Sequence, residues 1–347
     1  MKKSLLALAV LGAFAGVASA QSSVTVYGIV DASIVSMDNG ATTNGRVTRM
    51  DSGRDSASRI GFKGVEDLGN GLKATFLLEN GFSADAGTLA TANSLFSRLS
   101  YVGLEGNFGG VRLGRQNAPI KTALDVIDPF ANAGMAGSID YFGYSTAAGE
   151  ATTPERVSNQ IVYLSPKFGG FSGSASYTFG EVRGRNSANR GYGAQLGYAN
   201  GPLNVQFGYA DNNGSIAGDN DTKNTLLGAT YAFGAVKLHG GYKDTKVQAT
   251  VGGADVAKVH SYLVGVTVPF GASTVRASYI RNDVRNTTNT DSQAFALSYS
   301  YALSKRTSLY TTYVGSHNDS GSDMGVVDAG TLGQNSSGIA FGVKHTF

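Results

Sequence analysis

The chain has 347 residues, no cysteine and no tryptophan, and its 28 basic and 25 acidic residues give a formal net charge of +3. The absence of cysteine excludes disulfide frameworks, thiol catalysis and zinc–thiolate sites. A charge so close to balance excludes nucleic-acid binding driven by bulk charge. The 48 glycines and 17 tyrosines suit a protein with many tight turns and with aromatic residues at an interface.

The first twenty residues have the layout of a secretory signal peptide. Two lysines precede an apolar run over 5–17, and the small residues at 18–20 match a cleavage site. We therefore expect residues 1–20 to be removed, which leaves a single domain over 21–347. No later stretch holds about 18 consecutive apolar residues, so any membrane crossing must use strands.

Segments with alternating polarity follow from here to the C-terminus. Between Phe171 and Phe179, apolar side chains alternate with hydroxyl side chains, which gives an extended strand one apolar and one polar face. Such strands are typical of a barrel with lipid outside and water inside. Sixteen segments show this pattern: 24–36, 57–66, 71–83, 95–105, 110–116, 157–165, 171–180, 191–199, 203–211, 223–232, 235–245, 258–268, 273–283, 292–302, 306–316 and 336–347.

The connections between these segments alternate between short turns and long polar loops. The long loops cover 37–56, 84–94, 117–156, 212–222, 246–257 and 317–335. Short periplasmic turns and long extracellular loops distinguish the two ends of an outer-membrane barrel. The predicted fold is therefore all-β: a sixteen-stranded antiparallel transmembrane β-barrel in the bacterial outer membrane, surrounded by lipid.

Six segments of the chain carry recognisable motifs: 27–31, 58–74, 101–104, 113–116, 163–166 and 342–347. Together they resemble the general porins of betaproteobacteria, the trimeric family found in Neisseria, Burkholderia and Bordetella. The resemblance covers the mature chain and is most distinctive over 58–74. It implies a homotrimer whose barrels each hold a water-filled pore, narrowed by an inward-folded third loop. It also implies that Phe347 is the signal read by the outer-membrane assembly machinery.

The loop over 117–156 has an unusual composition. It is the longest gap between predicted strands, and it has no lysine or arginine from residue 122 to residue 155. Its apolar segments need a surface to pack on, and the inside of the barrel is the nearest one. The alternative is a loop exposed at the cell surface. Asp125, Asp128 and Asp140 are the candidates for the loop's side of a pore constriction.

Three arginines have inward parity on their strands: Arg59 against outward Ile60, Arg98 against outward Leu99 and Tyr101, and Arg156 against outward Val157. The resemblance matches them to the family's arginine cluster at the constriction.

Glu79 also has inward parity and is the acid expected beside these arginines. Arg115 shares its parity with outward Val111 and Leu113. Arg115 therefore either lies at a strand end or marks a slip in the register.

The favoured function is passive diffusion of ions and small hydrophilic solutes, with an anion bias from the arginines. A substrate-selective channel and an adhesin or surface-structural barrel remain alternatives. No enzyme activity, metal or cofactor is expected, because the four histidines show no recognisable catalytic context. The acidic loop from Asp211 to Asp221 lacks a regular calcium-ligand spacing.

Overall fold

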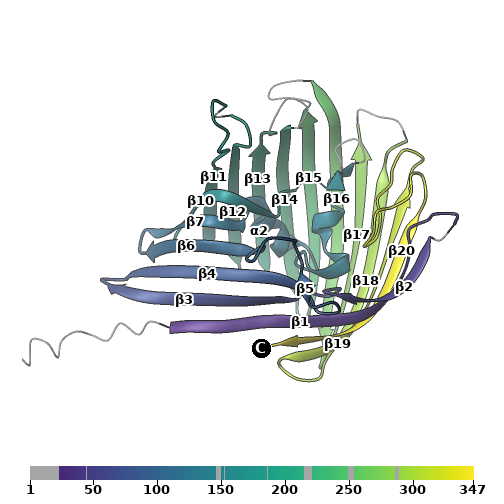
Figure 1. Ribbon diagram of the computed structural model, residues 1–347, viewed down its shortest axis with the longest axis horizontal. Helices are drawn as coiled ribbons and strands as arrows, with labels where there is room; N and C mark the ends of the chain where they lie inside the picture. The colour runs from purple at the N-terminus through teal and green to yellow at the C-terminus, as the bar shows by residue number, and fades with distance from the viewer. Residues whose placement is uncertain are drawn as a thin grey trace, which may run out of the picture.

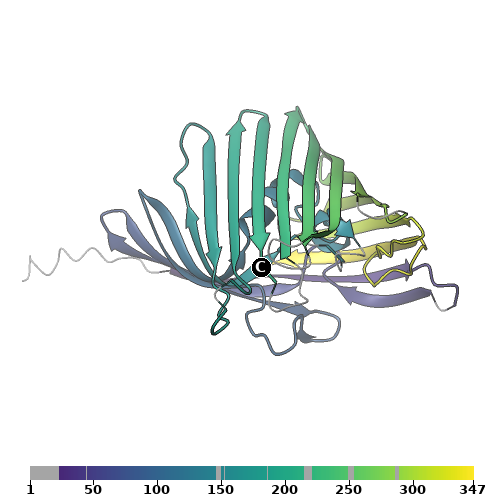
Figure 2. The same cartoon turned by 90° about the horizontal axis from the view of Figure 1, so that it is seen from above.

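The computed structural model describes residues 23–43, 45–145, 150–151, 153–185, 187–214, 221–248, 254–285 and 289–347. The expected signal peptide over 1–20 lies outside these residues. Figures 1 and 2 show long strands wrapped around a short helix, α2. No helix among the described residues has the length and apolar character needed to cross a membrane.

Sixteen antiparallel strands form a closed barrel, which confirms the predicted fold. The second strand is interrupted, and its two parts are β2 and β3. The barrel closes because one edge of β1 pairs with β3 and β2 in turn, while the other edge pairs with β20 over residues 29–38. The strands are β1 Ser23–Asp38, β2 Arg46–Ser52, β3 Arg59–Gly69, β4 Leu72–Ser83, β6 Leu99–Gly106, β7 Gly109–Asn117, β10 Arg156–Leu164, β11 Phe171–Thr178, β12 Gly191–Asn200, β13 Leu203–Asn212, β14 Asp221–Phe233, β15 Val236–Gln248, β16 Asp255–Phe270, β17 Ser273–Val284, β18 Ser292–Ala302, β19 Thr307–Asn318 and β20 Ser336–Thr346.

Three predicted loops contain strands of their own; one of them is the third loop, over 117–156, with β8 (Tyr144–Ser145) and β9 (Glu150–Ala151). The loop expected over 37–56 includes β2, and the loop expected over 84–94 includes β5 (Thr88–Leu89). The break between β2 and β3 has a local cause: the backbone N–H groups of Asp55 and Ser56 donate to the carboxylate of Asp31, at 3.0 and 2.6 Å. Because these N–H groups bond to a side chain, the segment leaves the ladder of the sheet.

Strand parity agrees with the expected inside and outside of the barrel at most positions. On β13, Phe207 is 39% exposed and faces outward, whereas its neighbour Gln206 is 5% exposed and faces the lumen. In a water-soluble protein the pattern is the reverse, with the phenylalanine buried inside and the glutamine exposed outside. The observed pattern is what a lipid-facing exterior requires.

The third loop packs on the inner face of the wall. Its helix α2 (Pro119–Ile127) contacts β11 to β15. Glycines on the wall make room for the helix: a Cβ atom on Gly208 would lie 2.9 Å from Ile120, and one on Gly228 would lie 2.5 Å from Ile127. Apolar side chains of the loop, including Leu124 and Ile127, are fully buried there. The loop also contains η1 (Gly134–Ala136), η2 (Ser138–Asp140), β8 (Tyr144–Ser145) and β9 (Glu150–Ala151).

Polar side chains of the wall hold the loop backbone in place. The ring Nδ1 of His239 lies 3.1 Å from the carbonyl oxygen of Ile127. The ammonium group of Lys243 donates to the carbonyl of Phe142 at 2.9 Å. Asn282 donates its amide to the carbonyl of Tyr141 at 2.8 Å. Each contact satisfies a buried carbonyl that the irregular loop leaves unpaired.

Asp128 organises the loop from within. Its carboxylate accepts three backbone N–H groups, from Phe130 at 3.2 Å, Asn132 at 2.7 Å and Ser138 at 3.0 Å. Burial raises the pKa of Asp128 to about 6, and the three donors oppose this rise. The carboxyl group therefore remains largely ionised at neutral pH and can accept all three bonds.

The substitution Asp128→Asn is expected to loosen the loop without unfolding the barrel. Asparagine has one acceptor oxygen, and its NH2 group would face backbone N–H groups, which are also donors. Each N–H group left unpaired costs about 1–3 kcal/mol of stability. Hydrogen exchange at the amides of Phe130, Asn132 and Ser138 should accelerate. Asp125→Asn is the matched control, because Asp125 accepts bonds from side chains only. Unchanged exchange in the Asp128→Asn protein would contradict this account.

Candidate functional site at the pore constriction

A cavity of about 770 Å³ lies between the third loop and the wall formed by β1, β3, β4 and β10. We term it the constriction cavity. All three predicted arginines line it, and so does Glu79 on the same wall. Asp125 and Asp140 line it from the loop. The structure thus brings together six of the seven residues that the sequence suggested for the constriction: Arg59, Arg98, Arg156, Glu79, Asp125 and Asp140.

Glu79 holds two of the arginines together. Its carboxylate lies 2.6 Å from Nε of Arg98 and 3.8 Å from Nε of Arg59, and it accepts a hydrogen bond from the hydroxyl of Tyr27 at 2.8 Å. The Glu79 side chain is only 6% exposed, whereas those of Arg98 and Arg59 are 15% and 24% exposed. The acid therefore lies behind the guanidinium groups and offsets their mutual repulsion, while the arginines face the cavity.

The third arginine and the loop acids each have their own partner. Arg156 pairs with Glu155 at 2.6 Å. Asp125 pairs with Lys121 at 2.8 Å, an i,i+4 pair on α2, and also accepts the side-chain amide of Asn132 at 2.6 Å. The Asp125 side chain is more exposed than that of Lys121, so the acid is the member of the pair that faces water.

Asp128 does not take part in lining this cavity. Its side chain is 3% exposed and faces the loop's own backbone. Among the described lining residues, four are basic and four are acidic: Arg59, Arg98, Lys121 and Arg156 against Glu79, Asp125, Asp140 and Glu155. The charges balance in number but not in position, because the three guanidinium groups lie on the wall, whereas the more exposed carboxylates of Asp125 and Glu155 lie on the loop.

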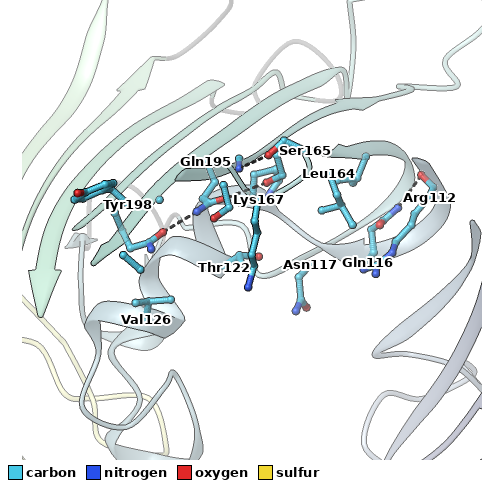
Figure 3. A pocket seen from close by; sticks show the side chains of 18 of the residues that line it. Arg112, Gln116, Asn117, Thr122, Val126, Leu164, Ser165, Lys167, Gln195 and Tyr198 are labelled. Atoms are coloured by element: carbon cyan, nitrogen blue, oxygen red, sulfur yellow. Dashed lines mark hydrogen bonds between the residues drawn. The ribbon is translucent and has the colours of Figure 1, made fainter. Parts of the chain in front are cut away.

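A second cavity, of about 660 Å³, lies on the side of α2 toward the short turns. We term it the lower cavity. Figure 3 shows wall side chains such as Arg112, Gln195 and Tyr198 around it, with Thr122 and Val126 of α2 completing its lining. Its two charged lining residues among those described are both basic, Arg112 and Lys167.

Arg112 is fixed in place by two neighbours. Its Nη2 lies 2.8 Å from the carboxylate of Glu105, and its guanidinium lies 4.9 Å from the ring centre of Tyr101. Lys167 has no ion pair within the part of the chain that the structure describes. Glu105 therefore offsets the charge of Arg112 from outside the lining, and Lys167 adds a positive charge to the lower cavity.

The predicted facing of the residues next to Arg98 is wrong. Leu99 and Tyr101, expected to face outward, both line cavities inside the barrel. The outward residues on β6 are Val102 and Leu104, which are 57% and 46% exposed. Arg98 still reaches the constriction cavity because it precedes β6, where strand alternation does not apply.

A register shift explains the positions of Val157 and Arg115. The pairing of β7 with β10 slips between Val157 and Gln160, next to Asn159, which has a φ of 57°. Val157 consequently packs against the internal apolar cluster instead of facing lipid. Arg115 donates to the carbonyl of Ser97 at 2.6 Å. Arg115 is the third residue from the end of β7 and also donates to the hydroxyl of Ser158 in the bulge at 3.0 Å, so both explanations apply to it.

Sequence reasoning missed Lys121, Glu155 and Tyr27 at this site. Lys121 and Asp125 have the i,i+4 spacing of a helical ion pair, and Pro119 is a favourable residue for a helix start. If these two signals had been read as an amphipathic helix within the loop, Lys121 would have been placed beside Asp125 at the site. Tyr27 carried no comparable signal, because a tyrosine on a barrel strand is more often at the membrane interface.

Comparisons with known proteins agree with this architecture. The family model described as Gram-negative porin matches residues 7–321. The chain is 37% identical to outer membrane porin protein 32 of Delftia acidovorans, with both chains covered completely. It is 34% identical to an outer membrane porin protein of Bordetella pertussis, over 89% of this chain and 93% of the relative.

Among solved structures, the chain is similar to the anion-selective porin from Comamonas acidovorans. The TM-score is 0.84 at 32% sequence identity, and the match covers 94% of this chain and all of the other. The fold, the long match to the family and the full-length relatives all point to one assignment. This chain belongs to the Gram-negative porin family and forms a β-barrel channel of the bacterial outer membrane.

Proposed function

We propose that this porin passes ions and small hydrophilic solutes by passive diffusion, with a preference for small anions. The main support for this proposal is that positively charged side chains follow one another along the lumen. Arg59, Arg98 and Arg156 line the constriction cavity, and Arg112 and Lys167 line the lower cavity without a lining acid. Over both cavities, six basic residues lie against four acidic ones among the described lining residues, and Glu105 pairs with Arg112 from outside the lining, so the preference is modest.

The magnitude of these charge interactions suits conduction. A unit charge 4 Å from a permeating ion contributes about 1 kcal/mol in bulk water and about 4 kcal/mol at an effective dielectric constant near 20. Interactions of this size bias the choice between anions and cations without trapping the ion. The relative from Comamonas acidovorans is named as anion-selective, which supports the same sign of selectivity here.

The proposed channel has no catalytic role. Three of the four histidines make contacts typical of structural residues: His239 with the carbonyl of Ile127, His260 with Asp244, and His345 with Thr307. Within the described residues, no group of three or more His, Cys, Asp or Glu side chains could hold a metal ion. The known relatives are porins, and this supports a channel without enzymatic activity.

The proposed functional unit is a homotrimer joined through the outer face of β1 to β7 and β20. Tyrosines at the membrane interface are typical of lipid-facing surfaces, yet the two tyrosines of β1 to β7, Tyr27 and Tyr101, both line the lumen. The outer face of this region is instead apolar, with Val26, Ile34 and Phe341 each more than half exposed. When two different parts of this face pack head to tail, the arrangement closes in a ring, as a trimer requires.

Phe347 is proposed as the residue that the outer-membrane assembly machinery reads. Its backbone N–H donates to the carbonyl of Gly28 and its carbonyl accepts the N–H of Gly28, both at 3.1 Å. Its ring lies where a Cβ atom on Gly28 would be, so it contacts backbone and is 44% exposed. A side chain with so little packing suits recognition better than stability.

Replacing Arg59, Arg98 and Arg156 together by serine is expected to move the channel to cation preference, because the loop acids would then dominate. The reversal potential in a salt gradient measures this. The shift should shrink at high salt, since the Debye length falls from about 10 Å at 0.1 M to about 3 Å at 1 M. Arg156→Ser alone should shift in the same direction by less. The control Lys305→Ser/Arg306→Ser should keep the reversal potential of the unmodified protein. If the triple variant keeps it as well, the three arginines do not set the ion preference.

The native mass in mild detergent should be that of three chains. The double variant Val26→Arg/Ile34→Arg is expected to give monomers, because two charges would be buried without partners at each contact. Val264→Arg serves as the control: Val264 is also exposed and apolar but lies on β16, away from the proposed interface, so the trimer should persist. Monomers of the unmodified chain would rule out this arrangement.

The substitution Phe347→Ser is expected to reduce the amount of porin in the outer membrane at least several-fold in cells. Refolding of the same variant from denaturant into detergent should proceed normally, because few contacts are lost. Measuring both quantities separates recognition from stability. Normal levels in the outer membrane would disprove the assembly role, and failed refolding in vitro would indicate a structural role instead.

A further inference from the structure

A row of basic side chains crosses four neighbouring strands at the long-loop end of the barrel. Lys223 of β14 lies directly opposite Lys246 of β15, and Lys246 lies opposite Lys258 of β16. Arg285, at the end of β17, donates its backbone N–H to the carbonyl of Lys258 and extends the row by one strand. We term these four residues the basic row.

The basic row faces away from the lumen. The sequence neighbours of its lysines point inward and are fully buried: Asn224 beside Lys223, Thr245 and Val247 beside Lys246, and Ala257 and Val259 beside Lys258. Since side chains alternate along a strand, the lysines lie on the outer surface. Their partial exposure agrees with this.

The two ends of the row have acidic partners, but its centre does not. Lys223 lies 3.9 Å from Asp211, and Arg285 lies 2.8 Å from Asp283. Lys246 and Lys258 have neither a hydrogen bond nor an ion pair from their side chains to any residue that the structure describes. Like charges directly opposite each other on adjacent strands destabilise the sheet. An external anion at the central pair would remove this cost.

Carboxylates do lie one step nearer the middle of the barrel, and they are already engaged. Asp244 is 3.2 Å from His260, and the two residues are cross-strand partners. Asp283 is the partner of Arg285. Asp244 and Asp283 therefore form a second row below the cations. Toward the long-loop end, the carboxylate of Asp255 accepts the side-chain amide of its cross-strand partner Gln248 at 3.0 Å.

Aromatic residues fix the depth of the row in the membrane. Tyr242 and Tyr262 face outward on the same two strands, four residues toward the barrel's middle, with ring centres 5.4 Å apart. Such tyrosines lie at the level of lipid headgroups. Four residues span about 13 Å along a strand and about 10 Å along the membrane normal, because barrel strands tilt by about 35–45°. The long flexible lysine side chains can cover part of this height, so their ammonium groups reach the outer headgroup layer.

We propose that the basic row binds the phosphate group of an anionic lipid headgroup in the outer leaflet. Neighbouring strands are about 4.8 Å apart, so one phosphate can contact Lys246 and Lys258 together. A lysine ammonium is a strong point-charge partner for phosphate. Each cation near an anionic lipid surface contributes roughly a fivefold gain in affinity. The site lies on β14 to β17, away from the face proposed for trimer contacts, and does not depend on ion selectivity.

The test uses the intact porin in mixed detergent–lipid micelles and counts bound lipid by native mass spectrometry. The probes are phosphatidic acid, which has a phosphate monoester headgroup, and phosphatidylcholine, which has no net charge. The unmodified protein should retain phosphatidic acid in preference. The triple variant Lys223→Gln/Lys246→Gln/Lys258→Gln should lose this preference, with about a fivefold loss of affinity for each lysine removed. Lys258→Gln alone should give about a fivefold loss and covers the case in which the triple variant fails to fold.

The matched control removes charge at the opposite end of the barrel. Lys305→Gln/Arg306→Gln lies in the short turn between β18 and β19 and should bind phosphatidic acid as the unmodified protein does. Equal binding of both lipids, or equal losses in the control and the variants, would overturn the proposal. Inorganic phosphate at millimolar concentration should not displace the lipid; if it does, the row is a site for free anions and the assignment to a lipid headgroup fails.

Discussion

Lipid offers no hydrogen-bond partner, so every backbone N–H and C=O group within the membrane must bond to another group of the protein. This requirement governs the structure. A strand in hydrocarbon cannot leave its edge unpaired, so the sheet must close. β1 achieves the closure by pairing with β2 and β3 along one edge and with β20 along the other. At the break between β2 and β3, the carboxylate of Asp31 accepts the free N–H groups. The carboxylate of Asp31 also accepts the hydroxyl of Tyr310 from β19 at 2.5 Å. One buried acid thus connects both sides of the closure.

Closure of the wall creates the surface on which the pore is built. The lumen is too wide for wall side chains to fill, and the third loop occupies one side of it. Glycines provide the seat for α2, and His239, Lys243 and Asn282 bind the loop's carbonyl groups. The open path is left on the other side, between the loop and the arginines of β3 and β10. The position of the constriction therefore follows from where the wall has small residues and where it has polar ones.

Much of the fold could be predicted because a barrel strand repeats with a simple period of two. Lipid outside and water inside impose opposite polarity on alternate residues, and this pattern survives in β13, where Phe207 and Gln206 fall as expected. The prediction was wrong where the backbone leaves that period. Arg98 lies outside its strand, and Asn159 adds a bulge that turns Val157 inward. The contacts inside the loop could not be predicted for a related reason. Asp125 and Asp128 are both aspartates in or next to α2, and only tertiary contacts decide that the side chain of Asp125 faces water while that of Asp128 accepts bonds from the backbone.

The placement of guanidinium groups on the wall and carboxylates on the loop has a consequence for solutes that carry both signs of charge. The electric field between the two sides runs across the pore, perpendicular to the direction of transport. A zwitterion or strongly dipolar molecule lowers its energy by turning its negative end toward Arg59 and Arg98 and its positive end toward Asp125. In the proposed constriction it then crosses the channel sideways. The constriction thus sorts molecules by the width they present in that orientation, so two solutes of equal mass and zero net charge can permeate at different rates.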